Sequence, residues 1–354
     1  MTRDALSYTE GEEIAGRYRI TGVLGRGGFG AVYAGEHLGT EQAVAIKMLS
    51  LEESPADSQA SERFLREARI TARLSHPNTV RVFDVGRADG GPLFLVMELL
   101  RGPTLEQLLT RLEEQGRCMS ERQAAAVAIP VLQSLGEAHA AGLVHRDLKP
   151  ANIMLAHVTG SDEPVVKVLD FGCTQTPDSN LTLDGAMLGT PAYMSPEQCR
   201  SDPLDGRSDL YALAIVIFRA VTGRLPFDDP SPLSLLYAHA GTPPPDPREV
   251  AGRSIDDEFA TLLLATLAKQ PDDRPSDAHD LRRKFEAIVR RLEAAGADAD
   301  DVVSGKEAHS GHLGALVTRM MGGMPLAARR ADGGPDGHTV PYAPGSGSAP
   351  LVAV

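Results

Sequence analysis

The chain contains little cysteine, with only Cys118, Cys173 and Cys199 among its 354 residues. Their number is odd, and no two of them form a Cys-x-x-Cys pair of the kind found in zinc sites. The sequence therefore indicates neither a disulfide framework nor a zinc centre. A reducing environment fits this pattern best, and we expect a cytoplasmic protein.

Positive charge is also in short supply. Lys and Arg total 35 against 48 Asp and Glu, which gives a formal net charge of −13. A surface of this sign repels a phosphate backbone, so we expect no nucleic-acid partner. Any site for a nucleotide must be a local feature of the chain.

Long apolar runs are missing as well. The longest, residues 210–221, is about half the length of a membrane span and contains Arg219, so we interpret it as a buried helix. The first residues, MTRDALSYTEGEE, are polar and acidic and lack the order of basic and apolar regions found in a signal peptide. We therefore expect no transmembrane segment and no export.

What the chain does have is an ordinary globular composition, with 42% hydrophobic and 23% charged residues. Short apolar stretches broken by glycines predict strands and tight turns over residues 18–47, and strand patterns return at 80–85 and 93–98. Between them a charged segment, 51–59, precedes a predicted helix over 61–74 with Ser61 as its N-cap.

The second part of the chain is helical in pattern, starting with residues 105–112 and 121–140 and ending near Ala295. Beyond Gly296 the composition shifts to Gly, Ala, Pro and Ser, which is typical of a flexible tail. One tail segment places six apolar residues on one helical face: Leu313, Leu316, Val317, Met320, Met321 and Met324. It could dock a partner, but packing on its own domain is the favoured interpretation.

The first motif that points to a chemical function is rich in glycine. Gly25, Gly27 and Gly30 form a Gly-x-Gly-x-x-Gly pattern between two predicted strands, and glycines let a backbone approach phosphate oxygens closely. The same spacing occurs in Rossmann domains and in structural hairpins, so it is weak alone. In a Rossmann domain a helix would follow the glycines, but here the chain continues into the apolar stretch Val-Ala-Ile-Lys, which ends at Lys47. A lysine at the end of an apolar strand is costly to bury unless an anion binds it. ATP phosphates suit Lys47, and Glu67 is a suitable carboxylate to orient it.

The most specific segment is residues 145–155, HRDLKPANIML, followed by Asp-Phe-Gly at 170–172. Asp147 is placed to accept the proton of a substrate hydroxyl, while Asn152 and Asp170 are hard oxygen ligands for Mg²⁺. Lys149 supplies positive charge where a transferring phosphoryl group gathers negative charge.

In this fixed order the motifs resemble those of the eukaryotic-like protein kinases, and are similar to the serine/threonine kinases of bacteria. The resemblance covers residues 18–292. It implies the α+β two-lobed protein-kinase fold, with a small β-rich lobe and one main helix over about 18–98 and a larger helical lobe over about 102–292. Residues 1–17 would be an N-terminal extension, and 293–354 a largely flexible tail.

The resemblance also implies a nucleotide site for ATP with Mg²⁺, or Mn²⁺ in its place. Met97 would act as gatekeeper, and residues 98–100 as the hinge. The residues implied to contact ATP lie in the glycine-rich loop, the lysine strand, the hinge and the cleft floor: Leu24, Gly25, Arg26, Gly27, Gly28, Phe29, Gly30, Val32, Ala45, Lys47, Glu98, Leu100 and Met154.

Residues 189–197 resemble the segment on which a peptide substrate docks, with Ser195 in place of the family's usual alanine. Glu197 and Arg274 resemble the family's buried ion pair, and Asp209 the helix residue that braces the catalytic loop. These three are expected to be structural, because breaking a buried pair costs several kcal/mol without touching the chemistry.

Regulation by phosphorylation is a further implication. Arg146 directly precedes Asp147 and could bind a phosphothreonine in the loop 170–197 by charge-assisted hydrogen bonds. Asp184 could provide a fixed negative charge there, and Cys173 is better interpreted as a packing residue than as a redox sensor. The candidate phosphorylation sites are, in order, Thr182, then Thr190, Thr176 and Thr174, with Ser179 as a weaker one.

The function predicted is a serine/threonine protein kinase that phosphorylates proteins and activates itself in its own loop, through transient self-association. A nucleotide-binding pseudokinase scaffold would lack at least one chemical group, yet Lys47, Glu67, Asp147, Asn152 and Asp170 are all present. A small-molecule phosphotransferase of the same fold would lack the docking segment 189–197.

Overall fold

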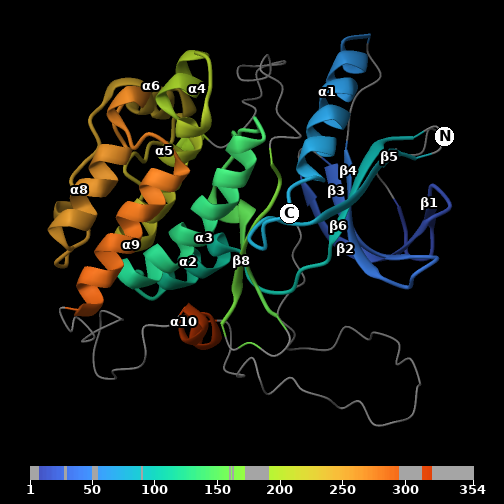
Figure 1. Ribbon diagram of the computed structural model, residues 1–354, viewed down its shortest axis with the longest axis horizontal. Coiled ribbons are helices and arrows are strands. Elements are labelled where there is room, and N and C mark those ends of the chain that lie inside the picture. The colour runs from blue at the N-terminus through green and yellow to red at the C-terminus, as the bar shows by residue number, and fades with distance from the viewer. Residues whose placement is uncertain are drawn as a thin grey trace.

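The two predicted lobes are both present in the computed structural model (Figure 1). It describes residues 8–27, 30–49, 55–88, 91–158, 161, 163–171, 191–294 and 313–320. A β-sheet with one helix forms one lobe, and helices form the other.

The sheet of the N-terminal lobe has six antiparallel strands in the order β1-β2-β3-β4-β6-β5. Consecutive strands are neighbours for most of this order, which suits short hairpin connections. The strands are β1 (Glu13–Ile14), β2 (Tyr18–Gly27), β3 (Gly30–His37), β4 (Ala43–Leu49), β5 (Val82–Arg87) and β6 (Leu93–Glu98).

Helix α1 (Pro55–Thr71) packs beside β5, but it begins earlier than the sequence predicted. Ser61 lies inside the helix, so its prediction as the N-cap was wrong. Proline fits the first turn of a helix, where its missing N–H needs no partner. The polar residues after Pro55 carry no apolar periodicity, which explains why the sequence pattern missed them.

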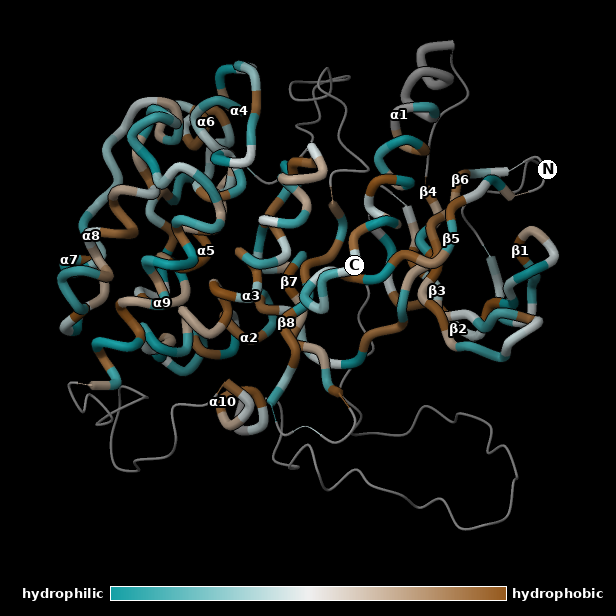
Figure 2. The backbone as a smooth tube through the Cα atoms, in the orientation of Figure 1, coloured by the Kyte–Doolittle hydropathy of each residue, from teal (hydrophilic) through white to brown (hydrophobic). Residues whose placement is uncertain are grey.

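The C-terminal lobe is built around α5, whose residues from Leu210 to Val221 are almost all buried, as predicted for this apolar run. Figure 2 shows hydrophobic stretches in α3 and α5, which pack against each other in this lobe. The helices are α2 (Leu105–Glu114), α3 (Glu121–Ala140), α4 (Pro196–Arg200), α5 (Gly206–Thr222), α6 (Pro232–Gly241), α7 (Pro247–Val250), α8 (Asp257–Thr266), α9 (Ala278–Ala294) and α10 (Leu313–Met320).

Short elements complete the lobe near the cleft. The hairpin β7–β8 joins Ile153–Ala156 to Val165–Val168, directly after the 3-10 turn η1 (Pro150–Asn152). Two other 3-10 turns, η3 (Pro191–Tyr193) and η4 (Pro271–Asp273), lie at the ends of loops. Among the described residues, none of the helices is both long and apolar enough to cross a membrane.

Helix α10 packs on its own domain. Leu313, Leu316 and Val317 are buried in the core of the C-terminal lobe, and α10 lies beside α2. The main-chain N–H of Gly314 donates to Glu163 Oε2 at 2.8 Å, in the loop that joins β7 to β8. The intramolecular interpretation of this segment is therefore confirmed, while Met321 and Met324 fall outside the described residues.

Candidate active site

Apolar residues of both lobes meet at the cleft. Val32 and Ala45 from the sheet share one buried cluster with Met154 of β7, and the hinge residue Leu100 packs against it. Met97, the predicted gatekeeper, belongs to the same cluster. These residues, all implied by the resemblance to line the ATP site, therefore come together although they lie far apart in the sequence.

The glycine-rich motif forms the β2–β3 hairpin, in which Gly25 faces Val32, Arg26 faces Ala31 and Gly27 faces Gly30. Gly30 has φ +144°, and a Cβ at this position would lie 1.9 Å from the carbonyl oxygen of Met48. Only glycine fits such a position. Gly28 and Phe29, at the turn itself, lie outside the described residues.

The hinge is tied to the floor of the cleft by charge. Lys167 Nζ of β8 contacts Glu98 Oε1 at 2.6 Å and donates to the carbonyl oxygen of Thr79 at 3.4 Å. Glu98 also accepts from the main-chain N–H of Arg81 at 2.8 Å. These bonds join β6 of one lobe to β8 of the other, a contact that the sequence did not predict.

Lys47 has a different partner from the one expected. Its Nζ lies 2.7 Å from Asp170 Oδ2, and both side chains are largely buried. Glu67 instead contacts Arg146, with 3.5 Å between Oε1 and Nη1. In this structure Glu67 therefore does not orient Lys47 through a direct ion pair, because Asp170 takes that place and Arg146 binds Glu67.

The residues of the predicted catalytic loop lie close together. Lys149 Nζ lies 2.9 Å from Asp147 Oδ2, and Asn152 Nδ2 donates to the main-chain carbonyl of Asp147 at 2.8 Å. The main-chain N–H of Leu169 donates to the carbonyl of Asn152 at 2.9 Å, which holds Asp170 next to this loop.

The donors near Asp170 fit a magnesium ion. Asn152 uses its amide nitrogen on Asp147, which leaves its amide oxygen for a separate role, and Asp170 supplies a carboxylate. Mg²⁺ typically takes one or two such oxygens together with substrate phosphates instead of an all-protein cage. In keeping with this, the described residues contain no cluster of three or more His, Cys, Asp or Glu side chains suited to a metal.

Asp209 braces the catalytic loop, as expected. Its carboxylate, 1% exposed, accepts from the main-chain N–H groups of His145 and Arg146 at 2.8 and 2.9 Å and contacts His139 Nε2 at 2.7 Å. Arg146 has φ +66° and Asp170 φ +52°, a left-handed conformation that non-glycine residues adopt only when their surroundings enforce it. The two bonds from Asp209 supply that constraint at Arg146.

Two histidines to which the sequence analysis assigned no role support the site. His145 is buried, contacts the carbonyl oxygen of Leu169 through Nε2 at 2.8 Å and stacks near Phe171 with ring centroids 4.9 Å apart. His139 holds Asp209 from α3. His145 is the first residue of the HRDLKPAN segment, but its own role became visible only from its contacts in the fold, as did that of His139.

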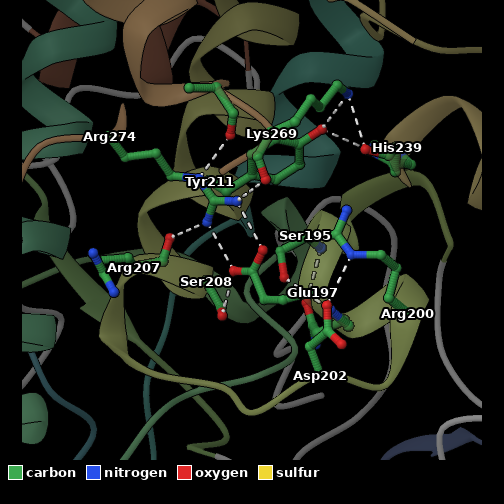
Figure 3. Close-up of polar contacts among 12 residues, drawn as sticks. Ser195, Glu197, Arg200, Asp202, Arg207, Ser208, Tyr211, His239, Lys269 and Arg274 are labelled. Atoms are coloured by element: carbon green, nitrogen blue, oxygen red, sulfur yellow. Dashed lines mark hydrogen bonds and ion pairs between the residues drawn. The ribbon is translucent and has the colours of Figure 1, made fainter. Parts of the chain in front are cut away.

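The expected ion pair between Glu197 and Arg274 is confirmed, with Arg274 Nη1 and Nη2 at 2.8 and 2.7 Å from the two carboxylate oxygens (Figure 3). Burial alone would raise the pKa of Glu197, but hydrogen bonds from Arg274 and Ser208 lower it below its usual value. The pair therefore stays ionised, and it fixes the start of α4 to the loop after α8.

Ser195 caps α4 and connects it to the catalytic loop. Its hydroxyl accepts from the N–H of Gln198, and the Gln198 side chain accepts from the N–H of Ser195. The remaining Gln198 Nε2 donates to the carbonyl of Arg146 at 2.7 Å. A serine here thus adds a capping box, which an alanine could not form.

Residues 172–190, which include Cys173, Asp184 and every candidate phosphorylation site, lie outside the described residues.

The order of the motifs and the geometry of the catalytic loop agree with a comparison of the sequence with known families. The model of the protein kinase domain family matches residues 18–285. The chain belongs to this family.

Curated relatives support the same membership. The serine/threonine-protein kinase pkn3 of Myxococcus xanthus is 38% identical over 303 residues, which cover 83% of this chain and 54% of the relative. The probable serine/threonine-protein kinase PknB of Corynebacterium glutamicum is 36% identical over 295 residues, covering 81% and 44%. The chain thus spans about half the length of such relatives, and the predicted place among eukaryotic-like bacterial serine/threonine kinases is confirmed.

Solved structures confirm the predicted fold. A double mutant of the PknI kinase domain of Mycobacterium tuberculosis superposes with a TM-score of 0.62 and 27% sequence identity. The similarity covers 80% of this chain and 99% of that one. The two-lobed arrangement seen here is therefore that of a protein kinase domain.

Proposed function

We propose that this kinase domain is catalytically active and transfers the γ-phosphoryl group of ATP to serine and threonine hydroxyls of proteins. The observation that carries the proposal is the cluster of Asp147, Lys149 and Asn152 beside Asp170 and Lys47. A pseudokinase would lack one of these groups. The presence of the docking segment 189–197, whose residue Glu197 forms the ion pair with Arg274, favours a protein over a small molecule as acceptor.

In the proposed reaction each residue has one task. Asp147 orients the substrate hydroxyl and receives its proton as the new oxygen–phosphorus bond forms and the bond to the ADP oxygen breaks. Lys149, 2.9 Å from Asp147, stabilises the negative charge on the transferring group. Lys47 binds phosphate oxygens, and a magnesium or manganese ion held by Asn152 and Asp170 would neutralise phosphate charge.

The observed ion pairs also support a route of activation. Phosphate oxygens compete with Asp170 for Lys47, and a metal ion competes with Lys47 for Asp170. A phosphothreonine in the loop 172–190, with Thr182 as the first candidate, carries more charge than Glu67 and would take Arg146 from it. Glu67 would then be available to orient Lys47, as the sequence predicted. We propose that transient self-association lets one copy phosphorylate this loop in another.

The test is phosphosite mapping after incubation with Mg-ATP of the wild type and of the variants Lys47→Met and Asp147→Asn. We expect phosphate on Thr182 or its neighbours in the wild type alone. The Asp147→Asn variant should lose about 10²–10⁴-fold in rate, because general-base assistance is removed, and still bind ATP. Equal phosphorylation by that variant would contradict the role of Asp147, and nucleotide binding without any phosphate in the wild type would support a pseudokinase.

A further inference from the structure

A buried cluster joins α5 and α6 on the side of the molecule away from the nucleotide. Lys269, in the loop after α8, donates from Nζ to the carbonyl oxygens of Ala238 and His239 at 3.1 and 2.9 Å and to Tyr211 Oη at 3.3 Å. Its ammonium group also lies 4.4 Å from the centre of the Phe227 ring. An ammonium has three N–H donors, so Lys269 is fully hydrogen-bonded.

Lysine at this place binds the end of a helix. Ala238 and His239 belong to the last turn of α6, whose carbonyl groups carry partial negative charge. The carbonyl of Ala238 also accepts from the main-chain N–H of Thr242 at 2.9 Å. Arg200 of α4 binds the next carbonyl, that of Ala240, at 3.2 Å. Two cations from two separate elements therefore hold the C-terminal end of α6.

The cluster continues from Lys269 toward the segment that precedes α4. Tyr211 accepts from Lys269 and so has its own proton free for His239 Nδ1, 3.1 Å away. The ring of His239 is fully buried, and α6, which carries it, lies against η3. Figure 3 shows Lys269, Tyr211 and His239 together above the Glu197–Arg274 pair.

The other side of η3 is fixed independently. The Tyr193 hydroxyl accepts from Arg219 Nη1 at 2.9 Å, and Arg219 in turn contacts Glu106 and Glu113 of α2. With η3 anchored there, the position of α6 decides the shape of the surface beside Ala192, because η3 lies against both α5 and α6.

Lys269 is itself held in place by the ion pair beside it. Arg274 donates from Nε to the carbonyl of Ala268 at 2.8 Å and from Nη2 to the carbonyl of Lys269 at 3.2 Å, while the same guanidinium binds Glu197. Burial lowers the pKa of Lys269 to about 8, so it remains mainly protonated at neutral pH. The cation is thus preorganised, and its position is set by the start of α4.

We infer that Lys269 is a positioning residue for the protein substrate, because it holds α6 and, through Tyr211 and His239, the segment Pro191–Tyr193 on which the substrate docks. The inference rests on the proposed docking role of residues 189–197. Lys269 touches neither the nucleotide cleft nor the catalytic loop, so its loss should affect the acceptor and spare ATP.

The test is steady-state kinetics with the best wild-type substrate from an arrayed serine/threonine peptide library. For Lys269→Met we expect the KM for peptide to rise about tenfold, as for loss of a charge-assisted hydrogen bond. The KM for ATP and ATP hydrolysis without peptide should stay within about twofold of wild type, which a general loss of folding would not produce. Lys269→Arg should restore most of the peptide affinity, and Lys284→Met, at a half-exposed lysine of α9, serves as the matched control.

Tyr211→Phe provides a second variant that removes only the hydroxyl link and keeps the aromatic core. We expect it to raise the KM for peptide about threefold, with ATP unaffected. An unchanged peptide KM in both Lys269→Met and Tyr211→Phe overturns the inference, as does a parallel rise in both KM values. If the wild type hydrolyses ATP but phosphorylates no peptide, the proposed function fails first, and the inference fails with it.

Discussion

At the residue scale, the candidate site and its surroundings are held together by side chains that are charged, buried and paired. Lys47 with Asp170 and Glu197 with Arg274 each combine a short contact with low exposure. Removing one partner of such a pair leaves an uncompensated charge, which costs far more than the pair contributes. His239 differs from these residues, because it is buried in a neutral form beside a cation.

The pKa of His239 gives a pH-dependent prediction. Burial, with the nearby charge of Lys269, lowers it to about 4 from the ordinary 6.5, and Tyr211 and Phe227 are its other ring neighbours. Between these two pKa values, His239 is protonated in the unfolded chain and neutral in the folded chain. Stability should therefore fall as pH drops from 6.5 toward 4, by up to about 1.4 kcal/mol per pH unit.

The variant His239→Gln isolates this contribution, because glutamine does not titrate. Urea unfolding of both proteins at pH 7, 6 and 5 should show the wild type losing stability faster than the variant as the pH falls. Parallel pH profiles would show that His239 is not the group responsible.

At the scale of single elements, the β2–β3 hairpin shows how a backbone conformation serves the nucleotide site. The chain lies close to β4 at Gly30, which permits this because it has no side chain to meet the carbonyl of Met48. At Gly22, in the same hairpin, a Cβ would meet none of the described residues within 4 Å, and φ is not positive. Gly22 is therefore a suitable control for a substitution at Gly30.

We expect Gly30→Ala to distort the hairpin at a cost on the order of 1–3 kcal/mol and to weaken ATP binding about tenfold or more. Gly22→Ala should leave ATP binding unchanged. Isothermal titration with a non-hydrolysable ATP analogue and thermal unfolding measure both effects. Equal behaviour of the two variants would show that close backbone approach at Gly30 does not shape the site.

At the scale of the whole molecule, α10 extends the domain beyond the region matched by the kinase family, which ends at residue 285. It packs beside α2, whose buried face belongs to the core of the C-terminal lobe, and it binds Glu163 in the β7–β8 loop. Part of the segment expected to be a flexible tail therefore contributes to the folded domain.

Replacing the buried Val317, 1% exposed, with Asp should lower the free energy of unfolding by roughly 2–4 kcal/mol, because it buries an unpaired charge against α2. The control Thr318→Ala alters a partly exposed neighbour and should have little effect. Thermal unfolding of both variants, and of a chain ending at Ala294, provides the measurement. A shortened chain as stable as the full one would contradict a structural role for α10.

Much of the site was predictable because its chemistry is local in sequence. Asp147, Lys149 and Asn152 lie within six residues, so their spacing alone placed them together. The glycines and the strand that contains Lys47 predicted where phosphate would bind. The change of apolar periodicity predicted a β-rich first part and a helical second part of the chain, and the resemblance of the motifs implied the two-lobed fold. The sequence alone thus determined which groups are present and what reaction they suit.

Only the tertiary structure decided which of these groups are partners. Two carboxylates, Glu67 and Asp170, could both serve Lys47, and the choice depends on where α1 lies relative to β8, which no local pattern encodes. The link from Lys269 through Tyr211 to the end of α6 likewise joins residues from three separate parts of the chain. Local spacing sets the chemistry of a segment, but ion pairs between distant segments form only when packing of the whole core brings them within a few ångströms.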